Sequence, residues 1–117
     1  MGFRDYYMIL ERASKMSKES FLADEQVRLE VRKAIEGMLS ELSILGSNLV
    51  DGRDEDLIWN LARKGVILAP LAQELSDIIS IYRSGVDELI FVNLVRIMED
   101  IEEAYYAIKS KLLESQK

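Results

Sequence analysis

Apolar residues recur at intervals of three or four along almost the whole chain, and this spacing constrains the fold more than any other feature of the sequence. Two stretches, residues 27–49 and 90–112, keep the pattern without a break. An α-helix has 3.6 residues per turn, so such spacing lines one face of a helix with apolar side chains. No segment alternates apolar and polar residues with a period of two. The sequence therefore predicts an all-α fold.

Five helical segments follow from this pattern and from the residue types that begin and end helices. We expect helices over residues 3–16, from Asp24 to about Gly52, from Asp54 to Gly65, from Pro70 to about Ser84, and from Asp87 into the C-terminal tail. Residues 66–70 are too isolated to form a strand, and Pro70 suits the first position of a helix. Short connections place consecutive helices side by side. We predict an antiparallel bundle of four or five helices, two of them long, in a single domain of residues 1–117.

The composition excludes several kinds of chemistry. The 117 residues include no cysteine and no histidine. Thiol chemistry, thiolate or imidazole metal sites and imidazole acid–base catalysis are therefore absent. The acidic clusters at residues 51–56 and 99–103 lack the spacing of a calcium loop, so we interpret them as helix caps and a solvated helix face. We predict neither a cofactor nor a bound metal.

The charge balance bears on the partners of the protein. The formal net charge is −6 and the pI is about 4.7. Because lysine and arginine provide the affinity for phosphates, we expect RNA binding to be weak or absent. No stretch approaches the roughly 18 consecutive apolar residues of a membrane span, and the first residues do not have the order of a secretory signal. We expect a cytoplasmic protein that makes no use of a membrane.

The two long helices carry more apolar residues than the shorter helices can cover. The surplus comprises Leu29, Ile35, Leu39 and Ile44 in the first long helix and Leu89, Phe91, Val92, Val95 and Met98 in the second. One interpretation places all of these residues in a monomeric core, and the other buries them in a symmetric dimer. We favour a homodimer. Gly46 lies inside a predicted helix, which indicates that another helix approaches it closely.

A few polar and aromatic residues are candidates for binding. Arg83 follows Tyr82 at the end of a predicted helix, where its guanidinium either binds a phosphate or pairs with Asp87 or Glu88 to join two helices. We favour the ion pair. The basic cluster Arg28-Arg32-Lys33 is interpreted as a solvated face, and Trp59 with the paired tyrosines as packing residues instead of stacking platforms for bases.

Several segments, taken in order, resemble the HepT-like branch of the HEPN proteins. They are residues 17–24 (SKESFLAD), Val27-Arg28 with the helix to Gly46, residues 56–59 (DLIW) with Leu61-Ala62, residues 65–67 (GVI), and residues 71–75 (LAQEL) up to Arg83. Members of that family are small helical-bundle dimers. Many are ribonuclease toxins paired with a minimal nucleotidyltransferase that serves as the antitoxin. The resemblance thus implies a bundle of this kind and a nucleotidyltransferase as the partner.

The catalytic motif of the family is degenerate in this chain. Family members carry an arginine, four to six further residues and a histidine, often with a tyrosine two residues later. Arg83 resembles the arginine, but Glu88 and Ile90 stand where the histidine and tyrosine would be, and Ile44 replaces a polar residue of the long helix. Metal-independent RNA cleavage needs a proton acceptor, a proton donor and a cation, of which Arg83 supplies only the cation.

We therefore expect no catalytic residues and a catalytically degenerate HepT-like protein that acts as a binding or regulatory component of a toxin–antitoxin-type system. Two alternatives stay open. One is a residual metal-independent ribonuclease that uses Arg83 with Glu88 or Asp87. The other is a purely structural homodimer without a ligand.

Overall fold

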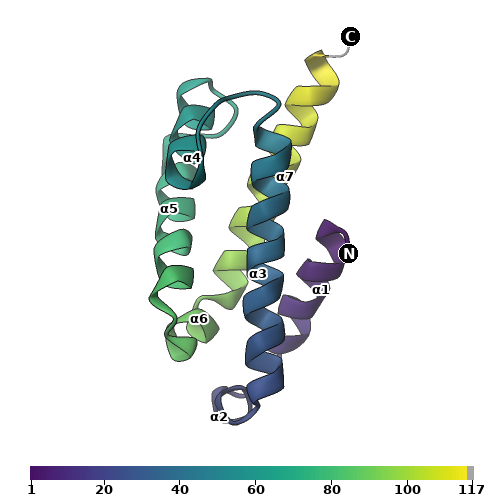
Figure 1. Ribbon diagram of the computed structural model, residues 1–117, viewed down its shortest axis with the longest axis vertical. Helices are drawn as coiled ribbons and strands as arrows, with labels where there is room; N and C mark the ends of the chain where they lie inside the picture. The colour runs from purple at the N-terminus through teal and green to yellow at the C-terminus, as the bar shows by residue number, and fades with distance from the viewer. Residues whose placement is uncertain (116–117) are drawn as a thin grey trace.

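The computed structural model describes residues 1–115, and this part of the chain is helical throughout apart from its turns (Figure 1). The helices are α1 (Phe3–Ser14), α2 (Lys18–Ala23), α3 (Glu25–Gly46), α4 (Asp54–Arg63), α5 (Ala69–Ser84), α6 (Asp87–Val92) and α7 (Leu94–Ser115). No strand occurs within residues 1–115. The all-α prediction is confirmed.

The helices α1, α3, α5 and α7 form the body of the molecule (Figure 1). The molecule measures 48 × 24 × 18 Å. As drawn in Figure 1, the chain runs down through α1, up through α3, down through α5 and up through α7. α1 packs against α3 and α7, whereas α4 and α5 pack against each other on the other side of α3. The short helices α2 and α6 meet at one end, where the rings of Phe21 and Phe91 lie 4.8 Å apart. Consecutive long helices are thus antiparallel.

The structure differs from the predicted helices in three places. Residues 18–23, which the sequence left between two helices, form the separate helix α2, because the Ser17 side chain accepts a hydrogen bond from the Ser20 amide at 3.1 Å and caps it. The first long helix ends at Gly46 and not near Gly52. There the side chains of Ser47 and Asn48 donate hydrogen bonds to the Ile44 carbonyl, which would otherwise lack a partner at the end of the helix.

The predicted last helix is divided into α6 and α7 by the single residue Asn93. Its side-chain amide donates to the Leu89 carbonyl at 2.8 Å, the acceptor that a continuous helix would offer to the Asn93 backbone. The Asn93 backbone amide bonds to Ile90 instead, at 3.2 Å. A side chain that competes with the backbone therefore breaks the helix.

The core is one continuous cluster of apolar side chains contributed by all seven helices. Its largest fully buried members include Leu10, Phe21, Ile35, Met38, Leu42, Leu57, Leu75, Ile78 and Leu94. Two glycines permit close packing. A Cβ at Gly37 would lie 2.4 Å from the ring of Tyr6, and one at Gly46 would lie 3.2 Å from Leu57. The close approach predicted at Gly46 is confirmed, and it comes from α4.

The surplus apolar residues fall into three groups by burial. Ile35 and Met98 are buried, so the prediction that they stay uncovered was wrong: both point into the core formed by the other helices. Leu39 and Phe91 are half-buried. The remaining five, Leu29, Ile44, Leu89, Val92 and Val95, are exposed. Within residues 1–115, no helix has the length and apolar character needed to cross a membrane.

Candidate functional site

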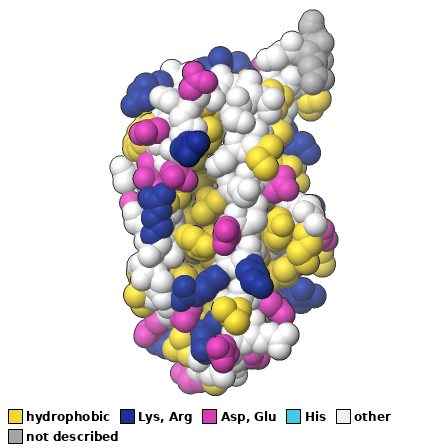
Figure 2. Space-filling view, in the orientation of Figure 1, with side chains coloured by type: hydrophobic (Ala, Val, Ile, Leu, Met, Phe, Trp, Pro, Cys, Tyr) yellow, Lys and Arg dark blue, Asp and Glu magenta, His cyan; other side chains and the backbone are white. Residues whose placement is uncertain are grey.

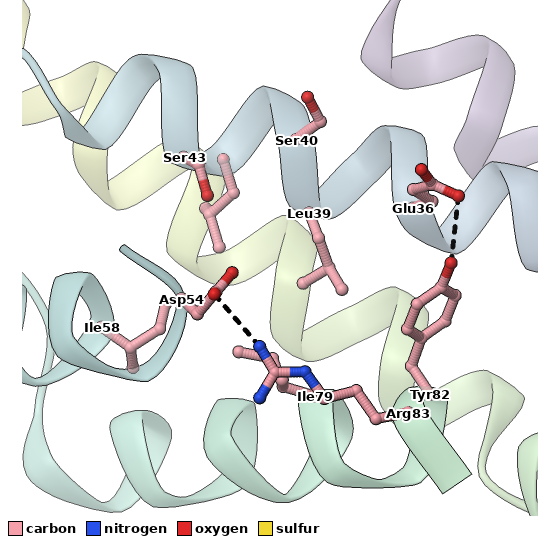
Figure 3. Close-up of a pocket in the computed structure, with 10 residues that line it drawn as sticks. Glu36, Leu39, Ser40, Ser43, Asp54, Ile58, Ile79, Tyr82 and Arg83 are labelled. Atoms are coloured by element: carbon pink, nitrogen blue, oxygen red, sulfur yellow. Dashed lines mark hydrogen bonds and ion pairs between the residues drawn. The ribbon is translucent and has the colours of Figure 1, made fainter. Parts of the chain in front are cut away.

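A cleft of about 300 Å³ lies between α3, α4 and α5 and contains Arg83 (Figure 3). Its apolar floor is formed by Leu39, Leu42, Ile58 and Ile79. Its polar rim is formed by Glu36, Ser40, Ser43, Asp54, Tyr82 and Arg83. Figure 2 shows hydrophobic side chains in the furrow between α5 and α3, with charged side chains mainly along its left side.

Arg83 lies at the end of α5 and binds two carboxylates on the first turn of α4. Its Nη2 lies 3.1 Å from Asp54 Oδ2, and its Nη1 lies 2.8 Å from Glu55 Oε1. The predicted pairing of Arg83 with Asp87 or Glu88 was wrong. Gly85 adopts a left-handed conformation with a φ of 69° and reverses the chain after α5, so the residues that follow lead away from the cleft.

Asp87 joins α6 to α3. Its carboxylate lies 2.8 Å from Arg32 Nη2 and 3.4 Å from Arg28 Nε, and Arg32 also donates to the Gly85 carbonyl. Arg28 and Arg32 are half-buried, so their interpretation as a solvated face was wrong, whereas Lys33 is exposed as expected. The side chain of Asp87 explains the difference, because it gives both arginines a partner on the neighbouring helix.

Glu88 takes no part in the contacts of Asp87 with the two arginines. It binds Lys18 of α2, whose Nζ is 2.8 Å from Glu88 Oε1. The hydrogen bond from Lys18 and its positive charge lower the pKa of the Glu88 carboxyl. A lowered pKa makes a carboxylate a weaker proton acceptor. Arg83 and Glu88 thus have separate partners on separate helices.

The far end of the cleft holds a hydrogen bond that the sequence did not reveal. The Tyr82 hydroxyl donates to Glu36 Oε2 at 3.0 Å, and Leu39 lies between this pair and the Arg83–Asp54 pair (Figure 3). Burial, followed by the hydrogen bond to Glu36, raises the pKa of Tyr82. The phenol therefore keeps its proton and acts as a donor. The spacing of residues 36, 39, 40 and 43 along one face of α3 is the signal that indicates a shared cleft wall.

A second polar group lies on the opposite side of α5. Asp100 of α7 faces Glu74 of α5, and burial, followed by the hydrogen bond with Glu74, raises the pKa of Asp100 to about 7. Asp100 Oδ2 is shielded from solvent and lies 3.7 Å from Arg96 Nε. The guanidinium of Arg96 also pairs with Asp77. The neighbouring space, about 380 Å³, is lined by residues of the α4–α5 connection and of α5, with Glu103 and Ala107 of α7.

The interpretation of residues 99–103 as a solvated face was wrong for Asp100, whose side chain is only 13% exposed. Its position three residues after Ile97 and four before Ala104, both buried, is the signal that places it on the inner face of the helix. Of the acidic residues at 51–56, Asp54, Glu55 and Asp56 lie in the first turn of α4, but their interpretation as helix caps was wrong, because the N-cap position is held by Arg53 and no side chain caps the helix. Phe3 stacks on Tyr105 with ring centroids 4.0 Å apart, in agreement with a packing role for that tyrosine.

The Arg83 cleft offers a guanidinium, carboxylates and hydroxyls. The guanidinium is already matched by Asp54 and Glu55, and the chain has no imidazole to move a proton near neutral pH. Within residues 1–115 no group of three or more acidic side chains is arranged to hold a metal ion. A scan against protein-family models, a search of curated proteins and a search of solved structures each found no match.

Proposed function

We propose that this chain is a catalytically degenerate HepT-like HEPN protein of the cytoplasm that acts by binding, as a component of a toxin–antitoxin-type system. The single observation that carries the proposal is the separation of Arg83 from Glu88. Arg83 binds Asp54 and Glu55 on α4, and Glu88 binds Lys18 on α2. The two groups that a residual ribonuclease would combine have different partners.

The physical requirements of RNA cleavage support this choice. A metal-independent reaction needs a base for the 2′-hydroxyl, an acid for the leaving oxygen and a cation for the phosphorane. The cation here is neutralised by two carboxylates, which also repel a phosphate. The loss of a general acid–base alone costs about 10²–10⁴ in rate.

The test is incubation of labelled RNA with the purified chain and with the Arg83→Ala variant, beside an Arg53→Ala variant as a control for loss of an exposed arginine. We expect no cleavage above buffer with any of the three. Cleavage by the original chain that disappears in Arg83→Ala and persists in Arg53→Ala would overturn the proposal and establish the residual ribonuclease.

The proposed partners are a second copy of the chain and a minimal nucleotidyltransferase. The exposed apolar side chains of Leu89, Val92 and Val95, on α6 and the start of α7, support association because such a group is costly to leave in water. Light scattering after gel filtration is expected to give twice the chain mass of 13.4 kDa. A monomer at all concentrations would contradict the homodimer. The same exposed residues also favour the alternative of a purely structural dimer.

Co-expression distinguishes a chain that binds a nucleotidyltransferase from a purely structural dimer. A tagged chain co-expressed with a minimal nucleotidyltransferase is expected to retain it through purification, and a tagged, unrelated helical bundle serves as the control. Failure of the nucleotidyltransferase to co-purify, with the dimer intact, would favour the structural alternative.

A further inference from the structure

The cleft between α3, α4 and α5 has an acidic character that its single arginine does not offset. Two carboxylates line it, those of Glu36 and Asp54, against the guanidinium of Arg83, and a third carboxylate, that of Glu55, binds the same guanidinium without lining the cleft. Arg83 is shared by Asp54 and Glu55, and none of the ion pairs within residues 1–115 includes Glu36. Glu36 accepts a hydrogen bond only from the neutral hydroxyl of Tyr82 among the described side chains. The Glu36 carboxylate therefore lies at the cleft without a cation at ion-pair distance, although Lys33 lines a neighbouring hollow with it.

The same cleft has an apolar floor between its charged ends. Leu39 points from α3 toward α5, and Ile79 lies opposite it on α5 (Figure 3). A volume of about 300 Å³ is at the lower end of the range of roughly 300–1,000 Å³ that ligand pockets occupy. The space suits a few side chains and not a large rigid ligand.

These two features together select the occupant. An anion is repelled by the three carboxylates, and a small inorganic cation gains nothing from the apolar floor. A group that combines a positive charge with apolar surface satisfies both parts of the cleft. We infer that the cleft binds a short segment of a partner protein in which a lysine or arginine stands beside apolar side chains, with Glu36 as the main anchor for the cation. This inference rests on the proposed binding function and names the chemistry of the partner.

The probes are two capped synthetic helical peptides of equal length. Both carry leucine at positions i, i+3, i+4 and i+7, and they differ only in having lysine or glutamate at the flanking positions. Isothermal titration calorimetry measures affinity, and amide chemical shifts of the isotope-labelled chain locate the contact. We expect the lysine peptide to bind with shifts centred on Leu39, Ile58 and Ile79, and the glutamate peptide not to bind.

The decisive variant is Glu36→Gln, which removes the charge and keeps an acceptor for the Tyr82 hydroxyl. We expect it to weaken the binding of the lysine peptide about two- to fivefold, within the range for one exposed ion pair. Glu30→Gln changes an exposed glutamate of the same helix outside this cleft and is expected to leave the affinity unchanged. Circular dichroism checks that both variants keep their helical content.

The inference is overturned if the glutamate peptide binds as well as the lysine peptide, if neither peptide binds, if the shifts centre elsewhere, or if the two variants weaken binding equally. None of these outcomes bears on the absence of ribonuclease activity. Conversely, Arg83-dependent RNA cleavage would refute the proposed function whatever the peptides do. The failure of the inference and the failure of the function are therefore distinguishable.

Discussion

The two sides of α5 arrange acidic side chains in opposite ways. Toward α4, Asp54 and Glu55 meet the guanidinium of Arg83 in an exposed position, and the side chain of Arg83 is 53% accessible to solvent. Toward α7, Glu74 meets another carboxyl, that of Asp100, in a position mostly shielded from water. Exposed opposite charges stabilise each other weakly, whereas shielded like charges force one group to keep a proton. The number of acids on each side says little, because their partners and burial decide their chemistry.

The largest expected effect is on the side toward α7, and it depends on pH. Burial and Glu74 raise the pKa of Asp100 to about 7, from an ordinary value of 3.8. Below about pH 4 the folded and unfolded chains both hold this proton. As the pH rises from there to about 7, the unfolded chain releases the proton while the folded chain keeps it. The free energy of unfolding therefore falls as the pH rises through this window.

The Asp100→Asn variant removes this loss and still offers Glu74 a hydrogen-bond donor. At about pH 8 we expect its free energy of unfolding to exceed that of the original chain by about 1–3 kcal/mol, less than the full shift implies because the site is not completely dry. Urea unfolding between about pH 4 and pH 8 measures the difference. Glu99→Gln, an exposed neighbour, is the control. A difference that does not grow with pH would remove the contrast between the two sides.

A smaller effect is expected where Tyr82 closes the cleft. Tyr82→Phe removes the hydroxyl that donates to Glu36 at 3.0 Å and keeps the ring. A typical hydrogen bond contributes about 0.5–1.5 kcal/mol, and because Glu36 is exposed we expect the free energy of unfolding to fall by an amount in this range. Thermal unfolding at neutral pH measures it. The double variant Glu36→Ala with Tyr82→Phe should lose less stability than the sum of the two single losses, and additive losses would show that the two side chains act independently.

The smallest effect is expected at Arg83. Its ion pairs with Asp54 and Glu55 are exposed, so Arg83→Ala should lower the free energy of unfolding by less than about 1 kcal/mol. At about 1 M salt the difference should shrink further, because salt screens exposed charges. Urea unfolding at two salt concentrations makes the comparison. A loss of several kcal/mol would mean that Arg83 is a structural anchor like Arg32, which is half-buried against Asp87.

Most helices were predictable because their signals are local. The spacing of Val31, Met38 and Leu42 marks the inner face of α3, and Pro70 lies in the first turn of α5 as expected. The errors came where a side chain competes with the backbone. Asn93 divides one predicted helix, and Ser47 with Asn48 ends another. Such competition depends on which conformation the rest of the fold imposes, and the residue types alone do not decide it.

The candidate site was predictable only in part. Arg83 was identified as the residue of interest at the end of its helix, but its partners lie 28 or more residues earlier in the chain and were assigned to a different residue pair. Glu36 and Tyr82, separated by 46 residues, carried no signal of their contact. The signal for Asp100 was present in the spacing of its buried neighbours, Ile97 and Ala104.

The sequence by itself determined that the described chain is helical, which helix faces are apolar, and that no imidazole or thiol takes part in its chemistry. These properties follow from the 3.6-residue period and from composition, which need no knowledge of distant contacts. Only the tertiary structure decided that Arg83 binds α4, that Asp87 binds α3 and that Asp100 faces another carboxyl. Ionic partners and burial depend on how helices pack, because electrostatic energies fall with distance and change with the local exposure to water.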